Sequence, residues 1–264
     1  MSMARTTWRK PPFIKNPTLR YGLYAAVTIY VVFTLATLPI DWDRVSDGMR
    51  RAQRIFNGAF PPNFERSGLL IDGFLESLKI AILATVGGIA LSVPLAFMAA
   101  RNVSIKPVYL LGRGIIIVAR SFHPVIVAII FVKAVGFGPF AGALTLVVYS
   151  IGFVAKLLAE RIEEIDFGQV EAMRSVGAGF LSTLVYAVVP QIMPRLVGLG
   201  IYQLDSNLRA SAVVGIVGAG GIGATLANAF GRYDYDFALA ITMVIVGVIL
   251  LSEAVSGFIR KQIA

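Results

Sequence analysis

The chain has 264 residues, of which 57% are hydrophobic and 15% are charged, against roughly 45–50% and 25% in soluble domains. A soluble protein of this length could not bury so much apolar surface, so we predict an integral membrane protein. Cysteine is absent and His123 is the one histidine, which excludes disulfides, thiolate metal sites and multi-histidine metal sites.

The net charge of +9 is interpreted as the basic cytoplasmic edge of a membrane protein, where Lys and Arg lie beside anionic lipid. No basic run with interleaved aromatic residues is present, and we expect no nucleic-acid partner. The lipid bilayer is the environment that this composition predicts.

The first 20 residues are basic and contain no acid, and the uncharged stretch 21–40 follows them. This stretch is too long for the apolar part of a cleavable signal and long enough to cross a bilayer. Residues 41–68 have mixed charge and two turn signals, and we expect their arginines to lie on an interfacial helix. We therefore assign 1–70 to an N-terminal tail, a first transmembrane helix and an external segment, and 71–264 to a transmembrane core.

Further apolar stretches predict an all-α, polytopic transmembrane helical bundle of about six spans. They cover 80–100, 114–135, 139–157, about 190–209 and 237–259. The N-terminal tail, the basic 101–113 loop and the C-terminal tail fall on one side of such a bundle. The positive-inside rule makes that side cytoplasmic for both termini, although the arginines of 41–68 oppose this assignment.

Small residues recur every fourth position in the second apolar stretch, which places them on one helix face. They are Ala84, Gly88, Ser92, Ala96 and Ala100. Such a face permits close helix approach, either within the chain or between two copies, and the pattern does not decide between them.

The polar stretch at about 158–182 carries the most specific motif of the chain. Its residues Glu171, Ala172, Met173, Arg174 and Gly177 are followed, nine residues further on, by the run that ends at Pro190. A short surface helix would end at a glycine that permits a turn, and Pro190 suits the first turn of a following helix.

This spacing resembles the EAA loop of importer permeases in the ATP-binding-cassette superfamily, with Met173 in place of the third motif residue. The resemblance covers the chain from about residue 70 onward. It implies the type I importer architecture, with a five-helix core and one additional N-terminal helix. It also implies that the 166–182 segment contains a coupling helix on which an ATPase docks.

The same resemblance implies the partners and the location. They are a second permease copy or a related permease, two cytoplasmic ATPase subunits and an extracytoplasmic solute-binding protein. ATP and magnesium would bind the ATPases, because this chain has no P-loop motif. We therefore expect no catalytic residue, no metal and no cofactor in this chain, which would reside in the bacterial cytoplasmic (inner) membrane.

A glycine-rich run contains Gly218, Gly220, Gly221 and Gly223. It matches G-x-G-x-x-G, but a dinucleotide site needs that motif in a βαβ unit, and here it lies between two predicted spans. We interpret the run as an outer gate. Its sequence resembles the phosphonate-type branch of these permeases, and the methionine-type branch has a related stretch.

Ionisable residues interrupt two predicted spans. Arg120 and His123 precede Pro124 in the third, where the proline favours a helix break. In the fifth lie the polar residues Asp205, Asn207 and Arg209. Such groups usually face a cavity or one another, so we predict gate or pathway roles for all of them. The alternatives are an i,i+4 ion pair for Asp205 and Arg209 and a shallow, snorkelling position for Arg120.

The sequence thus predicts the permease subunit of an ATP-driven importer that carries a phosphonate or related phosphorus oxyanion by alternating access. A methionine-type or other small-solute importer permease and a secondary transporter are the alternatives. A membrane-embedded enzyme would need clustered His, Asp or Ser, and a passive scaffold would not need the coupling motif.

Overall fold

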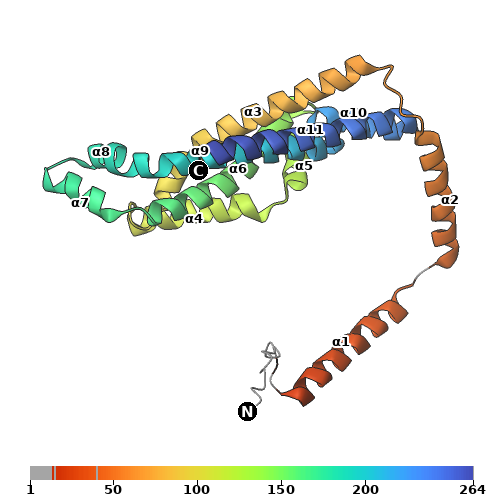
Figure 1. Cartoon of the computed structure of the whole chain (residues 1–264), viewed down its shortest axis with the longest axis horizontal. Coiled ribbons are helices and arrows are strands. Elements are labelled where there is room, and N and C mark those ends of the chain that lie inside the picture. Colours follow the sequence, from red (N-terminus) through yellow and green to blue (C-terminus); the bar gives the residue numbers. More distant parts are fainter. Residues whose placement is uncertain (1–13, 15, 40, 264) are drawn as a thin grey trace, which may run out of the picture. The chain divides into compact units, whose positions relative to one another are not determined.

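The computed structural model describes residues 14, 16–39 and 41–263, and within these residues every regular element is helical (Figure 1). The elements are α1 (Pro17–Thr37), α2 (Trp42–Ala59), α3 (Ser67–Met98), α4 (Lys106–Ser121), α5 (Pro124–Val135), α6 (Pro139–Glu163), α7 (Phe167–Ser175), α8 (Phe180–Thr183), the π-helical turn η1 (Leu184–Val188), α9 (Val189–Val214), the second π-helical segment η2 (Gly215–Ala219), α10 (Ile222–Gly231) and α11 (Tyr235–Ile263). The basic tail 1–13 lies outside the described residues, as do the side chains of Arg260 and Lys261.

The chain divides into two units, residues 1–54 and 55–264. In the first unit, α1 has no buried residue and exposes apolar side chains such as Tyr24 and Phe33. Helix α2 is amphipathic, with Trp42, Val45 and Met49 on one face, the arrangement of a helix that lies in a membrane interface. The sequence-based division at residue 70 stays a prediction.

Among the described residues, five helices are long and apolar enough to cross a membrane, and the number becomes six if the bent pair α4 and α5 forms one span. These lengths and compositions confirm the predicted polytopic bundle. The break lies where the sequence predicts it: α4 ends at Ser121, and α5 starts at Pro124 after a bend of 91°. His123 caps α5, since its Nδ1 accepts a hydrogen bond from the Val125 N–H at 3.3 Å.

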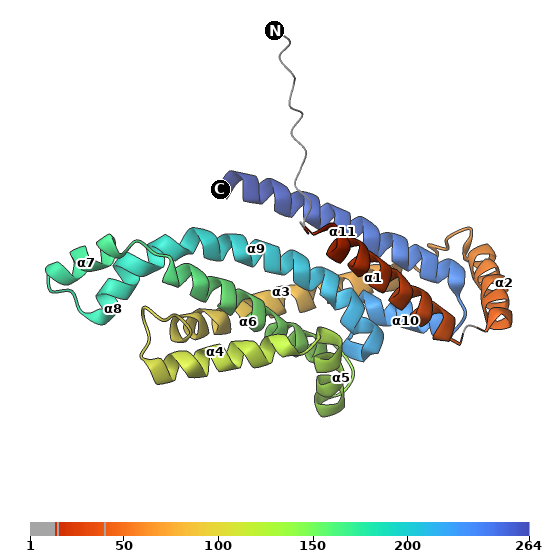
Figure 2. The ribbon, with the colours of Figure 1, turned by 90° about the horizontal axis from the view of Figure 1, so that it is seen from below.

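The second unit is built around α3, α6 and α9, which pack side by side (Figures 1 and 2). The small residues at 84, 88, 92, 96 and 100 are all buried within this unit. Gly88 lies against Ser150 of α6 so closely that an added methyl group would overlap it. The stripe of small residues therefore serves packing within the chain, which answers the question left open by the sequence.

A buried polar network joins the same three helices. The Asn207 amide donates to Thr85 Oγ1 at 2.9 Å and to Ser150 Oγ at 3.0 Å. The Gln203 amide donates to Ser150 Oγ at 3.1 Å and to Asn207 Oδ1 at 2.9 Å. In lipid such bonds hold helices together, because an unpaired polar group there is costly.

The fifth span differs from its predicted bounds. The helix begins at Phe180 rather than near Pro190 and runs as a 40-residue stretch to Ala219. Pro190 cannot donate a backbone hydrogen bond and crowds the preceding turn. The π-helical turn η1 immediately before α9 widens the helix at this point, so the chain passes the proline without ending.

Candidate functional site

The predicted coupling segment contains a short helix with both ends capped. Helix α7 begins after Asp166, whose side chain accepts the Gly168 N–H at 2.9 Å. At its other end Gly177 has a φ of +78°. The Gly177 N–H bonds the Arg174 carbonyl at 3.0 Å, and the Ala178 N–H bonds that of Met173 at 3.1 Å. This is a Schellman motif, which favours glycine at the left-handed position.

The motif residues of α7 project mostly away from the protein. Glu171, Ala172 and Arg174 are exposed. Val170 is buried, and Met173 packs against the hydrophobic cluster that contains Ile162 and Val188. The helix is therefore anchored by one apolar side and presents its acidic and basic residues outward, the geometry needed for docking a partner.

Helix α7 is tied to the start of α9 by a side chain that the sequence analysis did not select. Gln191 Oε1 accepts the Asp166 N–H at 2.8 Å, and its Nε2 donates to the Asp166 carbonyl at 3.3 Å. Gln191 also donates to the Ala187 carbonyl at 2.7 Å. A displacement of the α7 N-terminus would therefore be transmitted to α9 through these bonds.

A second missed residue, Glu163, joins the end of α6 to the basic loop. Its Oε1 accepts the Arg101 N–H at 2.8 Å and pairs with Arg113 Nη2 at 2.9 Å. Asn102 also donates to the Ile162 carbonyl at 2.7 Å. The phenol of Tyr109 raises the pKa of Arg101 through a hydrogen bond. The opposite charges of Glu163 and Arg113 were the available signal, but their separation in the sequence hid their proximity.

Arg120, near the end of α4, packs against the middle of α6. Its Cγ would be 2.8 Å from a Cβ placed on Gly152, which stands halfway along that helix. Arg120 and His123 are exposed and line a cleft of about 400 Å³ together with Pro124, Tyr149 and Phe153. The structure thus brings the predicted Arg120, His123 and Pro124 together beside one hollow.

Asp205 and Arg209 form the ion pair that the i,i+4 spacing offers, with Oδ2 and Nη2 2.8 Å apart. The Asp205 side chain is 9% exposed and that of Arg209 51%. Ser252 of α11 donates to Asp205 Oδ1 at 2.6 Å. Asn207 points instead into the buried network with Thr85 and Ser150, so the three polar residues of this span face two different surroundings.

The glycine-rich run extends from the end of η2 into the start of α10, and Gly220 and Gly221 connect the two elements. Gly218, Gly220 and Gly221 have φ values of +93°, +80° and +74°, which side chains rarely adopt. The Gly138 N–H bonds the Gly218 carbonyl at 3.0 Å, and Ser77 Oγ accepts the Ile222 N–H at 2.9 Å. Gly223 packs directly on the Ala212 carbonyl. Because the described residues hold no strand, this loop lacks the βαβ setting of a dinucleotide site.

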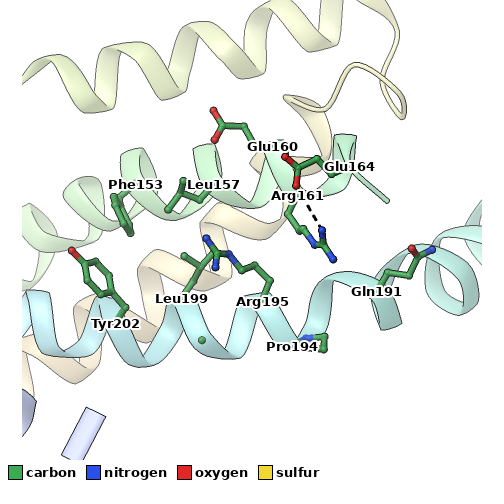
Figure 3. Close-up of a pocket in the computed structure, with 11 residues that line it drawn as sticks. Phe153, Leu157, Glu160, Arg161, Glu164, Gln191, Pro194, Arg195, Leu199 and Tyr202 are labelled. Atoms are coloured by element: carbon green, nitrogen blue, oxygen red, sulfur yellow. Dashed lines mark ion pairs between the residues drawn. The ribbon is translucent and has the colours of Figure 1, made fainter. Parts of the chain in front are cut away.

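A hollow with a volume of about 910 Å³ lies between α6 and α9 (Figure 3). From α6 it is lined by Phe153, Leu157, Glu160 and Arg161, and Glu164 follows at the helix end. From α9 it is lined by Gln191, Pro194, Arg195, Gly198, Leu199 and Tyr202. Arg161 Nη1 is 3.6 Å from Glu164 Oε2. A polar hollow between two spans suits the passage of a solute better than lipid contact.

These features define a helical membrane protein with a short, capped and largely exposed helix, α7, between two of its candidate spans. The family model for the inner membrane component of binding-protein-dependent transport systems matches residues 92–264. The chain belongs to this family. Membership confirms a permease that is not an enzyme and carries no cofactor of its own.

Two relatives show the range of the match. The phosphate-import permease protein of Mycolicibacterium smegmatis is 46% identical over 252 residues, which cover 95% of this chain and 47% of that protein. The chain thus spans about half the length of that relative. A phosphite transport system permease protein of Stutzerimonas stutzeri is 37% identical over 224 residues, covering 84% of this chain and 82% of that protein.

The fold has a counterpart among solved structures. An inward-facing methionine ABC transporter matches with a TM-score of 0.66 at 22% identity, over 76% of this chain and 99% of that chain. At this identity the likeness confirms the permease fold alone. This structural likeness does not identify the substrate.

Proposed function

We propose that the chain is the transmembrane subunit of an ATP-driven importer for a phosphonate or another phosphorus oxyanion. The named relatives are permeases for phosphate and phosphite, and these solutes share a tetrahedral anionic phosphorus centre. Arginine suits such anions, because its guanidinium group can donate two parallel hydrogen bonds. Arg120 and Arg195 both line clefts in the core.

The observation that carries the importer assignment is the capped helix α7, joined to α9 by Gln191. In our proposal two cytoplasmic ATPases dock on the Glu171 helices of two permease copies, identical or closely related. ATP binding moves α7, the spans rock, and the glycine loop opens toward a solute-binding protein outside the membrane. Both termini then lie in the cytoplasm. The free energy comes from the ATPase, and this chain converts it into alternating access.

The test is to tag the chain, purify it gently in detergent, and measure copurifying proteins and ATPase activity. We expect a stoichiometric ATPase whose activity rises with the solute-binding protein loaded with a phosphonate or phosphite. Stimulation by methionine instead of a phosphorus oxyanion would overturn the substrate and retain the importer. A chain that copurifies with no ATPase would overturn the importer assignment and favour a secondary transporter.

A further inference from the structure

The two clefts of the core share one wall. Phe153 of α6 lines both the 400 Å³ cleft of Arg120 and the 910 Å³ cleft between α6 and α9. Its ring stacks on Tyr202 of α9 with ring centroids 5.3 Å apart and an interplanar angle of 26°. Figure 3 shows this pair at one end of the larger cleft, with Arg161 and Arg195 further along it. Phe153 therefore lies between the two hollows, and its stacking partner Tyr202 lines the larger one.

Each hollow contains an arginine that forms no ion pair with a described residue. In the smaller cleft this arginine is Arg120, and the other ionisable groups of the lining are His123 and Tyr149. Arg195 is its counterpart in the larger one. Unpaired cations at membrane depth are costly and usually mark a path for ions or solutes.

The acids of the larger cleft are already engaged. Glu160 pairs with Lys156 at 3.5 Å, and Glu164 pairs with Arg161 at 3.6 Å. Arg195 is thus the cation of this cleft that no carboxylate neutralises, and its charge can attract an anion. Its volume exceeds what a phosphate-sized solute needs, so a hydrated anion fits.

We propose that Phe153 and Tyr202 form an aromatic gate between two anion-binding stations, one at Arg120 and His123 and the other at Arg195. This inference rests on the proposed import of a phosphorus oxyanion. The stacked rings obstruct passage, and the negative faces of the rings repel an anion. Separation of α6 from α9 would part the rings and join the two stations.

The larger cleft also has a direct link to the coupling helix. Gln191 lines it and binds both backbone groups of Asp166 at the start of α7. Tyr202 lies on the same helix as Gln191. A movement of α7 that shifts α9 would therefore reach the gate, so the state of the ATPase would control whether the stations communicate.

The experiment uses the whole complex of permease, ATPase and binding protein in proteoliposomes, with ³³P-labelled inorganic phosphate as the probe. Three quantities are measured: ATP-driven uptake, binding-protein-stimulated ATPase activity, and leak of the probe without ATP. The variants are Arg195→Gln, Arg195→Lys, Tyr202→Ala and Tyr202→Phe. Matched controls are Lys133→Gln and Phe140→Ala, which change exposed residues that line neither cleft.

We expect Arg195→Gln to lower uptake at least about tenfold with ATPase stimulation intact, and Arg195→Lys to restore part of it. Tyr202→Ala is expected to let the probe leak through the complex without ATP. Tyr202→Phe keeps the ring that stacks on Phe153, so we expect no leak from this variant. If Arg195→Gln took up the probe as fast as the wild type, the anion-binding station at Arg195 would be overturned. If Tyr202→Ala showed no leak of the probe without ATP, the aromatic gate would be overturned. Failure of the wild-type complex to take up the probe, with methionine or another solute carried instead, would overturn the proposed substrate.

Discussion

Gln191, at the start of the long α9 span, holds the first residue of the coupling-helix cap, Asp166, through both its backbone N–H and its carbonyl. The two residues are 25 positions apart in the chain. This paired contact is short enough to act as a mechanical joint, because a glutamine amide that uses both its oxygen and its nitrogen fixes the distance and the orientation of its partner.

Replacement of Gln191 by Leu should uncouple ATP hydrolysis from transport. The substitution keeps the side-chain size but removes both bonds to Asp166, each with a net value of about 1 kcal/mol. We expect uptake per ATP hydrolysed to fall roughly fivefold or more, while the ATPase still copurifies. Gln53→Leu, an exposed glutamine on α2, is the control. An unchanged ratio of uptake to hydrolysis would show that α7 moves α9 by another route.

The Schellman motif predicts a contrast between two neighbouring glycines. Gly177 has a φ of +78° and Gly179 a φ of −67°, and neither would meet another atom through an added Cβ. Gly177→Ala should therefore strain only the backbone, at a cost of about 1–2 kcal/mol, and loosen the end of α7. We expect weaker copurification of the ATPase for Gly177→Ala and none of this loss for Gly179→Ala. If both variants copurified with the same amount of ATPase, a rigid C-terminal end of α7 would not be required for ATPase binding.

The features that the sequence could predict are those set by neighbouring residues. The lengths of the apolar stretches predicted the membrane spans, and Pro124 predicted the break after α4. The spacing of Glu171 and Gly177 predicted the short helix α7 and its end. Each depends on local geometry, such as the missing N–H of proline or the freedom of glycine at positive φ. These elements form almost independently of the distant parts of the chain.

The features that the sequence could not predict depend on which helices become neighbours. Nothing near Gln203 shows that its amide meets Ser150, and nothing near Glu163 shows that it pairs with Arg113. The extended start of the fifth span was hidden for a different reason: Pro190 normally marks a helix start, but the π-helical turn before it lets the helix continue from Phe180. For Gln203, the one signal in the sequence for a buried polar contact was the presence of a glutamine within an apolar span.

Asn207→Leu should destabilise the bundle moderately. The change removes the bonds to Thr85 and Ser150 and leaves the Gln203 amide without one acceptor. We expect the free energy of unfolding to fall by only about 1 kcal/mol, because the hydroxyls of Thr85 and Ser150 still donate to carbonyls of their own helices. Thermal unfolding in detergent measures it, with Asn228→Leu on the exposed side of α10 as control. A variant as stable as the wild type would show that the network adds nothing to helix association.

Asp205 and Arg209 can be tested as an ion pair and as part of the pathway in one double-mutant cycle. Arg209→Gln leaves the nearly buried Asp205 carboxylate with the Ser252 hydroxyl but without its cation. We therefore expect this single variant to unfold at a lower temperature than the double variant with Asp205→Asn, in which no charge is left unpaired. Arg209 is half exposed, so the expected coupling energy is small, about 1 kcal/mol.

Transport separates the two roles of Arg209, because the double variant recovers stability without recovering the cation. We expect anion uptake to stay low in both Arg209→Gln and the double variant, with ATPase docking unchanged. Recovery of uptake together with stability would assign Arg209 to the structure of the α9 and α11 contact alone. The measurement is uptake by complexes matched for the amount of folded protein, so that a loss of stability does not imitate a loss of passage.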